Sequence, residues 1–277
     1  MGDKWLDLAG NVVVVTGAVG GMGTKFTEKY AEQGANLVLL DLSKEKVEQR
    51  ARELSNKFGI DAIGISCNTA DETEVQAAVT KTIDHFQQVD VLLNTAAILR
   101  FSPLEDLRLA EWRQAVDINL TGYFLTSQRF GKEMIKQHHG SIIHISTIAS
   151  RFPETYSGAY STTKAAVNML SKQIAAEWGQ FGIRSNCILP CLVKTPLSAD
   201  FYSDPQVEAG RKKLTASKRI GTLEDLANAV LYLSSNRSDY SNGAELTVEG
   251  GFGIMMGDQI PKPGGRREYA IKHHATK

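Results

Sequence analysis

Two side chains in the segment from His144 to Lys164 have the types and the spacing of a proton-transfer site. Tyr160 and Lys164 are four residues apart, so on a helix they share one face. Of the eight tyrosines only Tyr160 has a lysine at this spacing, whereas Tyr156 has Tyr160 there. A free phenol, with a pKa of about 10, is a poor base near neutral pH, but a nearby ammonium group lowers that pKa. The pair therefore predicts acid/base chemistry on an alcohol or a carbonyl, although alone it also fits an amphipathic helix with a solvated lysine.

A glycine-rich loop, TGAVGGMG, follows a run of four valines and opens a helical pattern. Gly17, Gly21 and Gly23 permit a tight turn, close approach of a pyrophosphate and close packing of the helix on the strand. The helix N-terminus adds free N–H groups and the positive end of the helix dipole. A glycine triplet alone is weak evidence, but in this context it predicts a dinucleotide site.

Asp41 ends the next apolar run and indicates which dinucleotide binds. A carboxylate at this point accepts hydrogen bonds from the adenosine ribose hydroxyls and repels a 2′-phosphate. Neither Gly20 nor Leu42 offers the positive charge that a 2′-phosphate needs. We therefore expect NAD rather than NADP, with a helix-capping role for Asp41 as the alternative.

Short β-branched runs alternate with longer helical patterns along the chain. This alternation is typical of parallel strands joined by crossover helices, and continuous apolar strands indicate a sheet that is covered on both faces. We expect an α/β fold, a doubly wound Rossmann-type parallel sheet of about seven strands with helices on both faces. The expected strands are 11–17, 35–41, 62–66, 89–97, 141–146, 183–190 and 244–250, and the expected helices are 22–33, 43–58, 71–85, 112–136, 160–178 and 222–233.

Composition and charge exclude several classes of protein. Lys+Arg and Asp+Glu are equal at 31 each, so there is no basic excess for binding nucleic acid. The first ten residues contain no apolar signal segment, and no apolar run is long enough to predict a membrane span. The three cysteines, Cys67, Cys187 and Cys191, are an odd, sparse set, which indicates a reducing, cytoplasmic location rather than a disulfide framework. Cys187 and Cys191 are close in sequence, but no histidine or third cysteine stands near them at metal-ligand spacing.

Several ordered motifs resemble those of the short-chain dehydrogenase/reductase family in its compact single-domain form. TGAVGGMG resembles the family's T-G-x-x-x-G-x-G, NTAA at Asn94 resembles N-N-A-G, and YSTTK at Tyr160 resembles Y-x-x-x-K. DINLTG contains the family's asparagine as Asn119, and NCILPCLVKTP stands for N-x-x-x-P-G followed by a threonine. The resemblance implies one NAD-binding Rossmann catalytic domain over residues 1–251, followed by a tail, 252–277, rich in Pro, Gly and charge.

The resemblance also implies the roles of individual residues. The implied catalytic set is Asn119, Thr147, Tyr160 and Lys164, in which Lys164 also holds the nicotinamide ribose and Asn119 continues a water-linked proton relay. Val193 and Thr195 would hold the nicotinamide carboxamide. The implied cofactor residues are Gly17, Val19, Gly21, Met22, Gly23, Asp41, Asn68, Asn94, Ala96, Tyr160, Lys164, Pro190, Val193 and Thr195. No metal is expected.

Two neighbouring hydroxyls compete for the role of polarising the substrate oxygen. The family's serine usually stands thirteen residues before the tyrosine, and counting back from Tyr160 gives Thr147 rather than Ser146. Threonine carries the same donor as serine. We therefore expect Thr147 to polarise the substrate and Ser146 to be a neighbour that is hydrogen-bonded to the adjacent loop.

Four positions depart from the family pattern without removing a catalytic group. Thr95 and Ala97 replace an asparagine and a glycine in the NTAA motif, and Cys191 replaces the glycine after a proline. Asn68 stands where the family usually has an aspartate that touches the adenine ring; its amide can still form a hydrogen bond. These changes are expected to alter cofactor affinity.

The substrate is the least determined part of the prediction. Arg100 and Arg151 follow two of the expected strands, and the segment beyond Thr195 adds RKKL and SKR. Because arginine binds carboxylates through two hydrogen bonds, these arginines, with Ser146, are candidate substrate residues. They favour a small polar substrate such as a sugar, polyol, sugar acid or hydroxy acid, with solvated surface charge as the alternative.

Family resemblance implies an NAD-dependent enzyme that interconverts a secondary alcohol and a ketone, assembled as a homotetramer through the helices 112–136 and 160–178. A carrier-bound 3-oxoacyl reductase is one alternative, but such enzymes usually prefer NADPH, which Asp41 disfavours. A catalytically silent NAD-binding regulator is another alternative. The intact set of Asn119, Tyr160 and Lys164 argues against that regulator.

Overall fold

The computed structural model describes residues 5–195, 198, 202–261, 263, 265 and 270–271. Within these residues, one sheet of seven parallel strands has the order β3-β2-β1-β4-β5-β6-β7. The strands are β1 Val12–Thr16, β2 Asn36–Asp41, β3 Ala62–Ser66, β4 Val91–Asn94, β5 Gly140–Ile145, β6 Ile183–Pro190 and β7 Glu245–Val248. The strand order reverses between β1 and β4, which is where doubly wound sheets open a ligand crevice. The predicted Rossmann-type α/β fold is confirmed.

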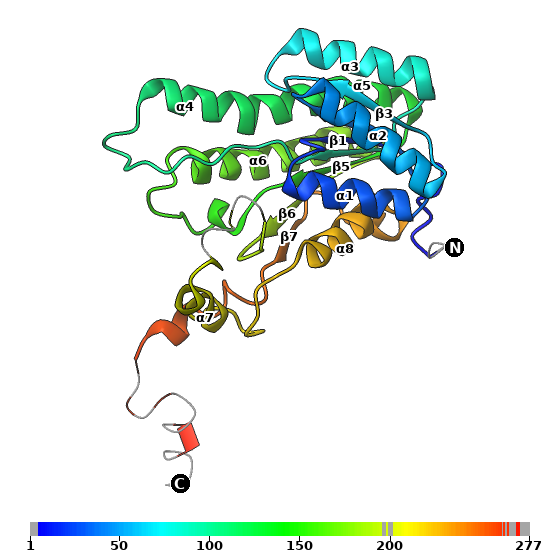
Figure 1. Cartoon of the computed structure of the whole chain (residues 1–277). Coiled ribbons are helices and arrows are strands. Elements are labelled where there is room, and N and C mark those ends of the chain that lie inside the picture. The colour runs from blue at the N-terminus through cyan, green and yellow to red at the C-terminus, as the bar shows by residue number, and fades with distance from the viewer. Residues whose placement is uncertain are drawn as a thin grey trace.

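Helices cover both faces of the sheet (Figure 1). They are α1 Gly21–Glu32, α2 Lys44–Phe58, α3 Glu72–Phe86, α4 Leu109–Val116, α5 Gly122–Gln137, α6 Tyr160–Trp178, α7 Pro205–Lys213 and α8 Leu223–Ser234. Alternate residues of β1 divide between two cores because successive side chains of a strand point to opposite faces. Val13 and Val15 pack with α1, α2 and α8, whereas Val12 and Val14 pack with α3, α5 and α6. None of the helices in the described part of the chain is long and apolar enough to cross a membrane.

Side-chain caps fix where three of the helices begin. Ser43 accepts a hydrogen bond from the backbone N–H of Lys46 at the start of α2, and Thr222 forms a capping box with Asp225 at the start of α8. Asp71 caps α3 by accepting the N–H groups of Thr73 and Glu74, but Glu74 does not bond back to Asp71. The carboxylate of Glu74 instead accepts the N–H of Asn68, 2.8 Å away, and so ties the end of β3 to α3.

The predicted continuous helix 112–136 is in fact α4 and α5 separated by a π-helical turn, Asp117–Thr121. Asn119 lies in this turn, fully buried. Its Oδ1 accepts the N–H of Ile98 at 2.8 Å, and its Nδ2 donates to the carbonyl of Ile98 at 2.9 Å. This double contact fastens the loop after β4 to the wide turn, and such turns often occur at functional sites. The short helix α7 was not predicted.

Candidate active site

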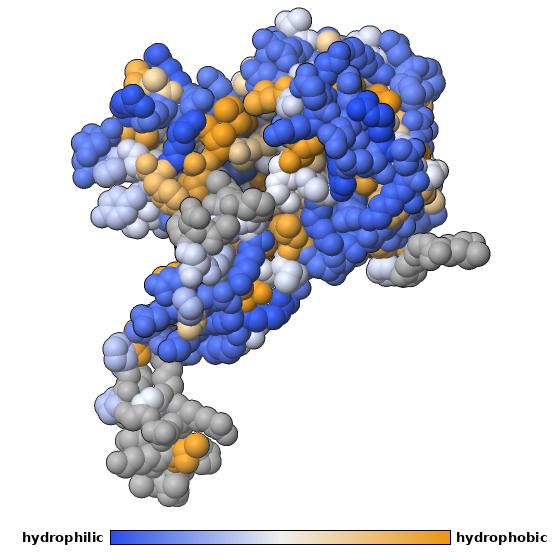
Figure 2. Space-filling view, in the orientation of Figure 1, coloured by the Kyte–Doolittle hydropathy of each residue, from blue (hydrophilic) through white to orange (hydrophobic). Residues whose placement is uncertain are grey.

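A cavity of about 750 Å³ lies along the carboxyl ends of the parallel strands. Figure 2 shows hydrophobic side chains gathered around the hollow in this face of the molecule. The cavity runs from the glycine loop after β1 to Tyr160 and Lys164 on α6. Fourteen of the predicted site residues line it: Gly17, Gly21, Met22, Gly23, Asp41, Asn68, Ala96, Ser146, Thr147, Tyr160, Lys164, Pro190, Val193 and Thr195.

The glycine loop has the geometry of a phosphate cradle. Gly17 has a positive φ of 64°, and a Cβ on it would lie 3.0 Å from the backbone of Ala96. A Cβ on Gly23 would lie 2.1 Å from the carbonyl oxygen of Gly17, so a larger residue would force the loop away from α1. No side chain caps α1 at Gly20, which leaves the first N–H groups of the helix available to an anion. This end of the cavity therefore fits a dinucleotide pyrophosphate.

Asp41 is held rigidly at the end of β2, where its carboxylate lines the cavity. Oδ2 accepts the N–H of Val19 at 3.1 Å, and Oδ1 accepts the N–H of Leu42 at 2.8 Å. A carboxylate oxygen accepts more than one hydrogen bond, so both oxygens retain capacity for ribose hydroxyls. Val19 itself does not line the cavity, because its N–H serves Asp41. The cap of α2 is Ser43, so the alternative capping role for Asp41 is not what the structure shows.

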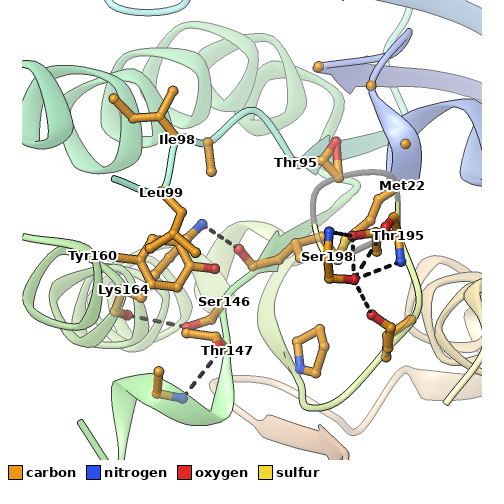
Figure 3. Close-up of a pocket in the computed structure, with 18 of the residues that line it drawn as sticks. Met22, Thr95, Ile98, Leu99, Ser146, Thr147, Tyr160, Lys164, Thr195 and Ser198 are labelled. Atoms are coloured by element: carbon orange, nitrogen blue, oxygen red, sulfur yellow. Dashed lines mark hydrogen bonds between the residues drawn. The ribbon is translucent and has the colours of Figure 1, made fainter. Parts of the chain in front are cut away.

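The catalytic end of the cavity brings Thr147, Tyr160 and Lys164 together (Figure 3). The Thr147 hydroxyl lies near Tyr160 and lowers the pKa of its phenol, and both side chains line the cavity. Thr147 Oγ1 also accepts the N–H of Ala149 at 3.2 Å, because Thr147 caps the short turn after β5. The Ser146 hydroxyl instead donates to the backbone carbonyl of Lys164 at 3.3 Å and is 2% exposed. The geometry therefore distinguishes Thr147, which faces the tyrosine, from Ser146, which fastens β5 to α6 rather than to the adjacent loop.

The predicted lowering of the Tyr160 pKa is wrong for the chain by itself. Burial raises the pKa of Tyr160 to about 12, the Glu154 carboxylate raises it as well, and the neighbouring Thr147 hydroxyl lowers it. Burial also lowers the pKa of Lys164 to about 7, so this ammonium loses part of its charge near neutral pH. Spacing along a helix reveals that a tyrosine and a lysine are neighbours, but it does not reveal how deeply both are buried.

Asn94 and Asn119 lie behind the cavity, and neither belongs to its lining. Asn94 is 1% exposed, donates to Ser127 Oγ at 3.2 Å and contacts His144 Nδ1 at 3.3 Å. Both amide atoms of Asn119 bind the backbone of Ile98. These two predicted residues therefore contact the strands and loops that shape the cavity.

The two candidate substrate arginines do not line the cavity either. The Nε of Arg151 donates to Glu245 of β7 at 2.8 Å, and Lys172 of α6 pairs with the same carboxylate. The Nε of Arg100 donates to Gln114 of α4 at 3.3 Å. Both arginines follow the expected strands, but each turns toward a neighbouring element that sequence spacing alone does not identify.

Several residues of the cavity wall were missed by the sequence analysis. They are Glu154 in the loop before α6, Ser198 and Tyr202 beyond β6, Arg211 of α7 and Phe252. Ser198 accepts the N–H of Thr195 at 3.0 Å and donates to the carbonyl of Val193 at 2.9 Å (Figure 3). A signal existed for two of them. Arg211 belongs to the basic run RKKL, and Phe252 is the first residue of the segment predicted as a tail, which lies partly outside the described residues.

Comparisons with known proteins agree with this geometry. A profile of the family described as Enoyl-(Acyl carrier protein) reductase matches residues 17–253. D-threitol dehydrogenase of Mycolicibacterium smegmatis is 36% identical over 247 residues, 89% of this chain and 94% of that protein. Galactitol 2-dehydrogenase of Rhizobium johnstonii is 34% identical over 257 residues, 88% of this chain and 96% of that protein.

A solved gluconate 5-dehydrogenase from Burkholderia cenocepacia J2315, in complex with NADP and tartrate, superposes with a TM-score of 0.85 and 31% identity. The match covers 89% of this chain and 96% of that one. The glycine loop, the Tyr160–Lys164 pair and the strand order thus occur in a chain that matches these dehydrogenases over nearly its whole length. The chain belongs to the short-chain dehydrogenase/reductase family and is an oxidoreductase that acts on CH–OH groups.

Proposed function

We propose that this protein is an NAD-dependent dehydrogenase that interconverts a secondary alcohol and a ketone in a small polyol or sugar. One observation carries the proposal: Thr147, Tyr160 and Lys164 line the same cavity as the uncapped glycine loop of α1. One end of the cavity fits a dinucleotide and the other places a proton donor and acceptor beside a substrate oxygen. Bound NAD would supply the hydride acceptor at the nicotinamide ring.

The residues of the chain move and hold the proton. In alcohol oxidation Tyr160, as phenolate, accepts the proton of the substrate hydroxyl, while Thr147 donates a hydrogen bond to the same oxygen. In ketone reduction Tyr160 returns the proton to the forming alkoxide. The Nζ of Lys164 lies 5.9 Å from the centre of the Tyr160 ring, and its charged form stabilises the phenolate. Both amide atoms of Asn119 are hydrogen-bonded to the backbone of Ile98, so the side chain of Asn119 helps to hold the loop that shapes this end of the cavity.

The preference for NAD over NADP rests on Asp41. Its carboxylate lines the adenosine end of the cavity, and Leu42, which follows it there, is uncharged. Among the described lining residues the cationic side chains are Lys164 and Arg211, and neither lies on the glycine loop or at the end of β2. A 2′-phosphate would meet negative charge with no compensating cation. The related gluconate 5-dehydrogenase was solved with NADP, so this preference requires a direct comparison of the two cofactors.

The choice of a neutral polyol or sugar rests on Glu154. This carboxylate lines the catalytic end of the cavity and acts electrostatically on Tyr160. A carboxylate accepts hydrogen bonds from substrate hydroxyls and repels substrate carboxylates. The relatives act, by their names, on threitol and galactitol. The proposal therefore places neutral polyols and sugars ahead of sugar acids and hydroxy acids.

A carrier-bound 3-oxoacyl reductase is the second candidate, because a relative that is 30% identical over 246 residues is named as one. Asp41 disfavours NADPH, which such reductases usually use. We also retain a homotetramer in the proposal. Its helices α5 and α6 carry the exposed apolar residues Phe124 and Met169, which association would cover.

An absorbance assay of NADH formation tests the proposal. Tetritols, hexitols, sugar acids, hydroxy acids and simple secondary alcohols are each supplied with NAD and, separately, with NADP. Turnover of neutral polyols with kcat/KM higher for NAD is the expected result. Equal or better turnover with NADP would contradict the role of Asp41 in selecting NAD over NADP. Reduction of a 3-oxoacyl thioester alone would favour the second candidate.

A further inference from the structure

Tyr123 of α5 lies directly behind the catalytic lysine, at a position to which neither motif nor cavity assigns a role. It is 2% exposed, and Lys164 is 1% exposed. The Nζ of Lys164 donates to the Tyr123 hydroxyl at 2.9 Å, and that hydroxyl donates to the carbonyl of Ile145 at 3.1 Å. Lys164 also donates to the carbonyl of Ile145 at 2.7 Å. The three groups therefore form a closed, buried triangle at the end of β5.

The triangle determines how the ammonium group of Lys164 can be used. An ammonium has three N–H donors, and Tyr123 and Ile145 occupy two of them. One donor is left for the cavity that Lys164 lines. The Nζ also lies 4.4 Å from the centre of the Tyr123 ring, a distance at which the ring face attracts a cation. Tyr123 thus supplies both an acceptor and an aromatic face to a charge that burial would otherwise remove.

A second buried ring supports Tyr123 from the side of β5. The ring of His144 stacks on that of Tyr123, with centroids 5.7 Å apart and an angle of 22°. His144 is held in turn by Asn94, whose Nδ2 lies 3.3 Å from His144 Nδ1. Burial lowers the pKa of His144 to about 3, so this ring stays neutral and adds no second cation beside Lys164. Asn94 and His144 therefore hold the Tyr123 ring in place.

We propose that Tyr123 is a positioning residue that holds Lys164 charged and aimed at the cavity, so that the ammonium can stabilise the Tyr160 phenolate. The proposal rests on the acid/base role proposed for Tyr160. Tyr123 does not relay protons, because its hydroxyl donates to the carbonyl of Ile145, and a carbonyl does not pass a proton onward. Its effect on the reaction therefore passes through Lys164.

The other titratable groups around Lys164 do not change charge near neutral pH. From β6, Cys187 faces the lysine, and burial raises the pKa of its thiol to about 12. Burial raises the pKa of Tyr123 well above its ordinary value, and that of Tyr160 to about 12. With His144 neutral, Lys164 is the group in this packed set that titrates near pH 7. Loss of the Tyr123 hydroxyl removes an acceptor that favours the charged lysine and lowers the lysine pKa further.

The variant Tyr123→Phe removes the oxygen and keeps the ring. Its matched control is Tyr30→Phe, a fully buried tyrosine of α1 whose hydroxyl lies 2.6 Å from Ser234 Oγ and far from Lys164 in the sequence and the fold. For Tyr123→Phe we expect the rising limb of the pH profile of alcohol oxidation to move up by about one pH unit, because a less charged lysine leaves the Tyr160 pKa higher. At neutral pH this corresponds to about a tenfold loss of kcat/KM. Tyr30→Phe should leave the pH of this limb equal to that of the wild type.

Two readouts do not depend on the substrate. NADH binding, followed by fluorescence titration, should weaken several-fold in Tyr123→Phe, and ¹⁵N NMR of labelled lysine in the protein without cofactor should show a lower pKa for Lys164. A Lys164→Met variant identifies that signal.

If no alcohol is turned over, the proposed function fails while the NMR result still tests the link between Tyr123 and Lys164. An unchanged Lys164 pKa in Tyr123→Phe would overturn the inference, as would equal shifts in the Tyr30→Phe control. Effects of Tyr123→Leu no larger than those of Tyr123→Phe would exclude any role for the ring.

Discussion

At the scale of single residues, two adjacent hydroxyls differ because successive residues at the end of β5 point in different directions. The Ser146 hydroxyl donates to the backbone carbonyl of Lys164, whereas the Thr147 hydroxyl lies near Tyr160 and lowers the pKa of its phenol. Thr147 Oγ1 also accepts the N–H of Ala149, so its orientation is fixed before substrate arrives. Thr147 therefore has the geometry of a pre-organised donor to the substrate oxygen.

Thr147→Val should reduce kcat by about 10²-fold or more, because it removes the hydroxyl and keeps the shape of the side chain. Thr147→Ser restores the donor and should keep most of the activity. Ser146→Ala should cost less than tenfold, since it removes one contact between β5 and α6. Initial rates on the best substrate of the panel measure all three. A larger loss in Ser146→Ala than in Thr147→Val would move the polarising role to Ser146.

Glu154 should set the pH dependence of the reaction. Its charge raises the pKa of Tyr160, so Glu154→Gln lowers that pKa and moves the rising limb of alcohol oxidation toward lower pH. The shift should be a few tenths of a unit, because Glu154 is exposed and solvent screens its charge. A profile of log kcat against pH for alcohol oxidation, at saturating polyol, gives the limb.

The matched control for this prediction is Glu105→Gln, an exposed carboxylate in the loop before α4 that does not line the cavity. Its limb should coincide with that of the wild type. If the rising limb of the pH profile of Glu154→Gln stays at the wild-type pH, or moves to higher pH, the electrostatic link between Glu154 and Tyr160 is contradicted. An unchanged KM for neutral polyols in that variant would separately contradict its proposed contact with substrate hydroxyls.

The residues that sequence alone could predict are those whose roles depend on local spacing. The glycine loop, Asp41, Tyr160 and Lys164 lie within short motifs, and the structure brings them to one cavity. Glu154 and Tyr123 could not be predicted in the same way. Their contacts join the loop before α6 and the body of α5 to the site, and nothing in their local sequence distinguishes them from surface or core residues.

At the scale of elements, periodicity predicted the strands well because most are fully buried and end in polar or glycine residues. β3 and β6 begin and end where predicted. The sequence did not predict the interruption of the helix 112–136, because a π turn contains no distinctive residue. The hydrogen bonds between Asn119 and Ile98 that accompany the turn join distant segments. α7 was missed because its few apolar residues give little periodic pattern.

Gly64 of β3 should be needed for the packing of α2 on the sheet. A Cβ on Gly64 would lie 2.4 Å from the backbone of Val47, which cannot move without displacing the helix. Gly64→Ala should therefore lower the free energy of unfolding by about 1–3 kcal/mol. Urea denaturation followed by circular dichroism measures the change. The control is Gly210→Ala in α7, where a Cβ meets nothing within 4 Å and should not destabilise the protein.

An unfolding midpoint for Gly64→Ala equal to that of the wild type would contradict this account of the contact between β3 and α2. A loss of the same size in Gly210→Ala would show that replacement of glycine itself, rather than the close approach to Val47, causes the effect. The helix content of both variants before unfolding should equal that of the wild type. Gly210→Ala puts a better helix former into a helix, and Gly64→Ala lies outside the helices.

At the scale of the whole molecule, the reversal of strand order between β1 and β4 collects residues from distant parts of the chain at one edge. The cavity takes its lining from the end of β1 as far as Phe252. The same topology explains why Arg151 was a reasonable but unused candidate: β7 lies beside β6, and its Glu245 pairs with that arginine. Sequence order gives no measure of that proximity.

The most direct test of the central claim compares two tyrosines four residues apart. Tyr160 is half-buried in the cavity wall with Thr147 and Lys164, whereas Tyr156 is 66% exposed. NADH formation is measured on the best polyol of the panel for Tyr160→Phe and Tyr156→Phe, with NADH binding as a check on folding. We predict a loss of at least about 10³-fold in Tyr160→Phe and less than threefold in Tyr156→Phe, with cofactor binding retained in both. Turnover by Tyr160→Phe within tenfold of the wild type would contradict the account.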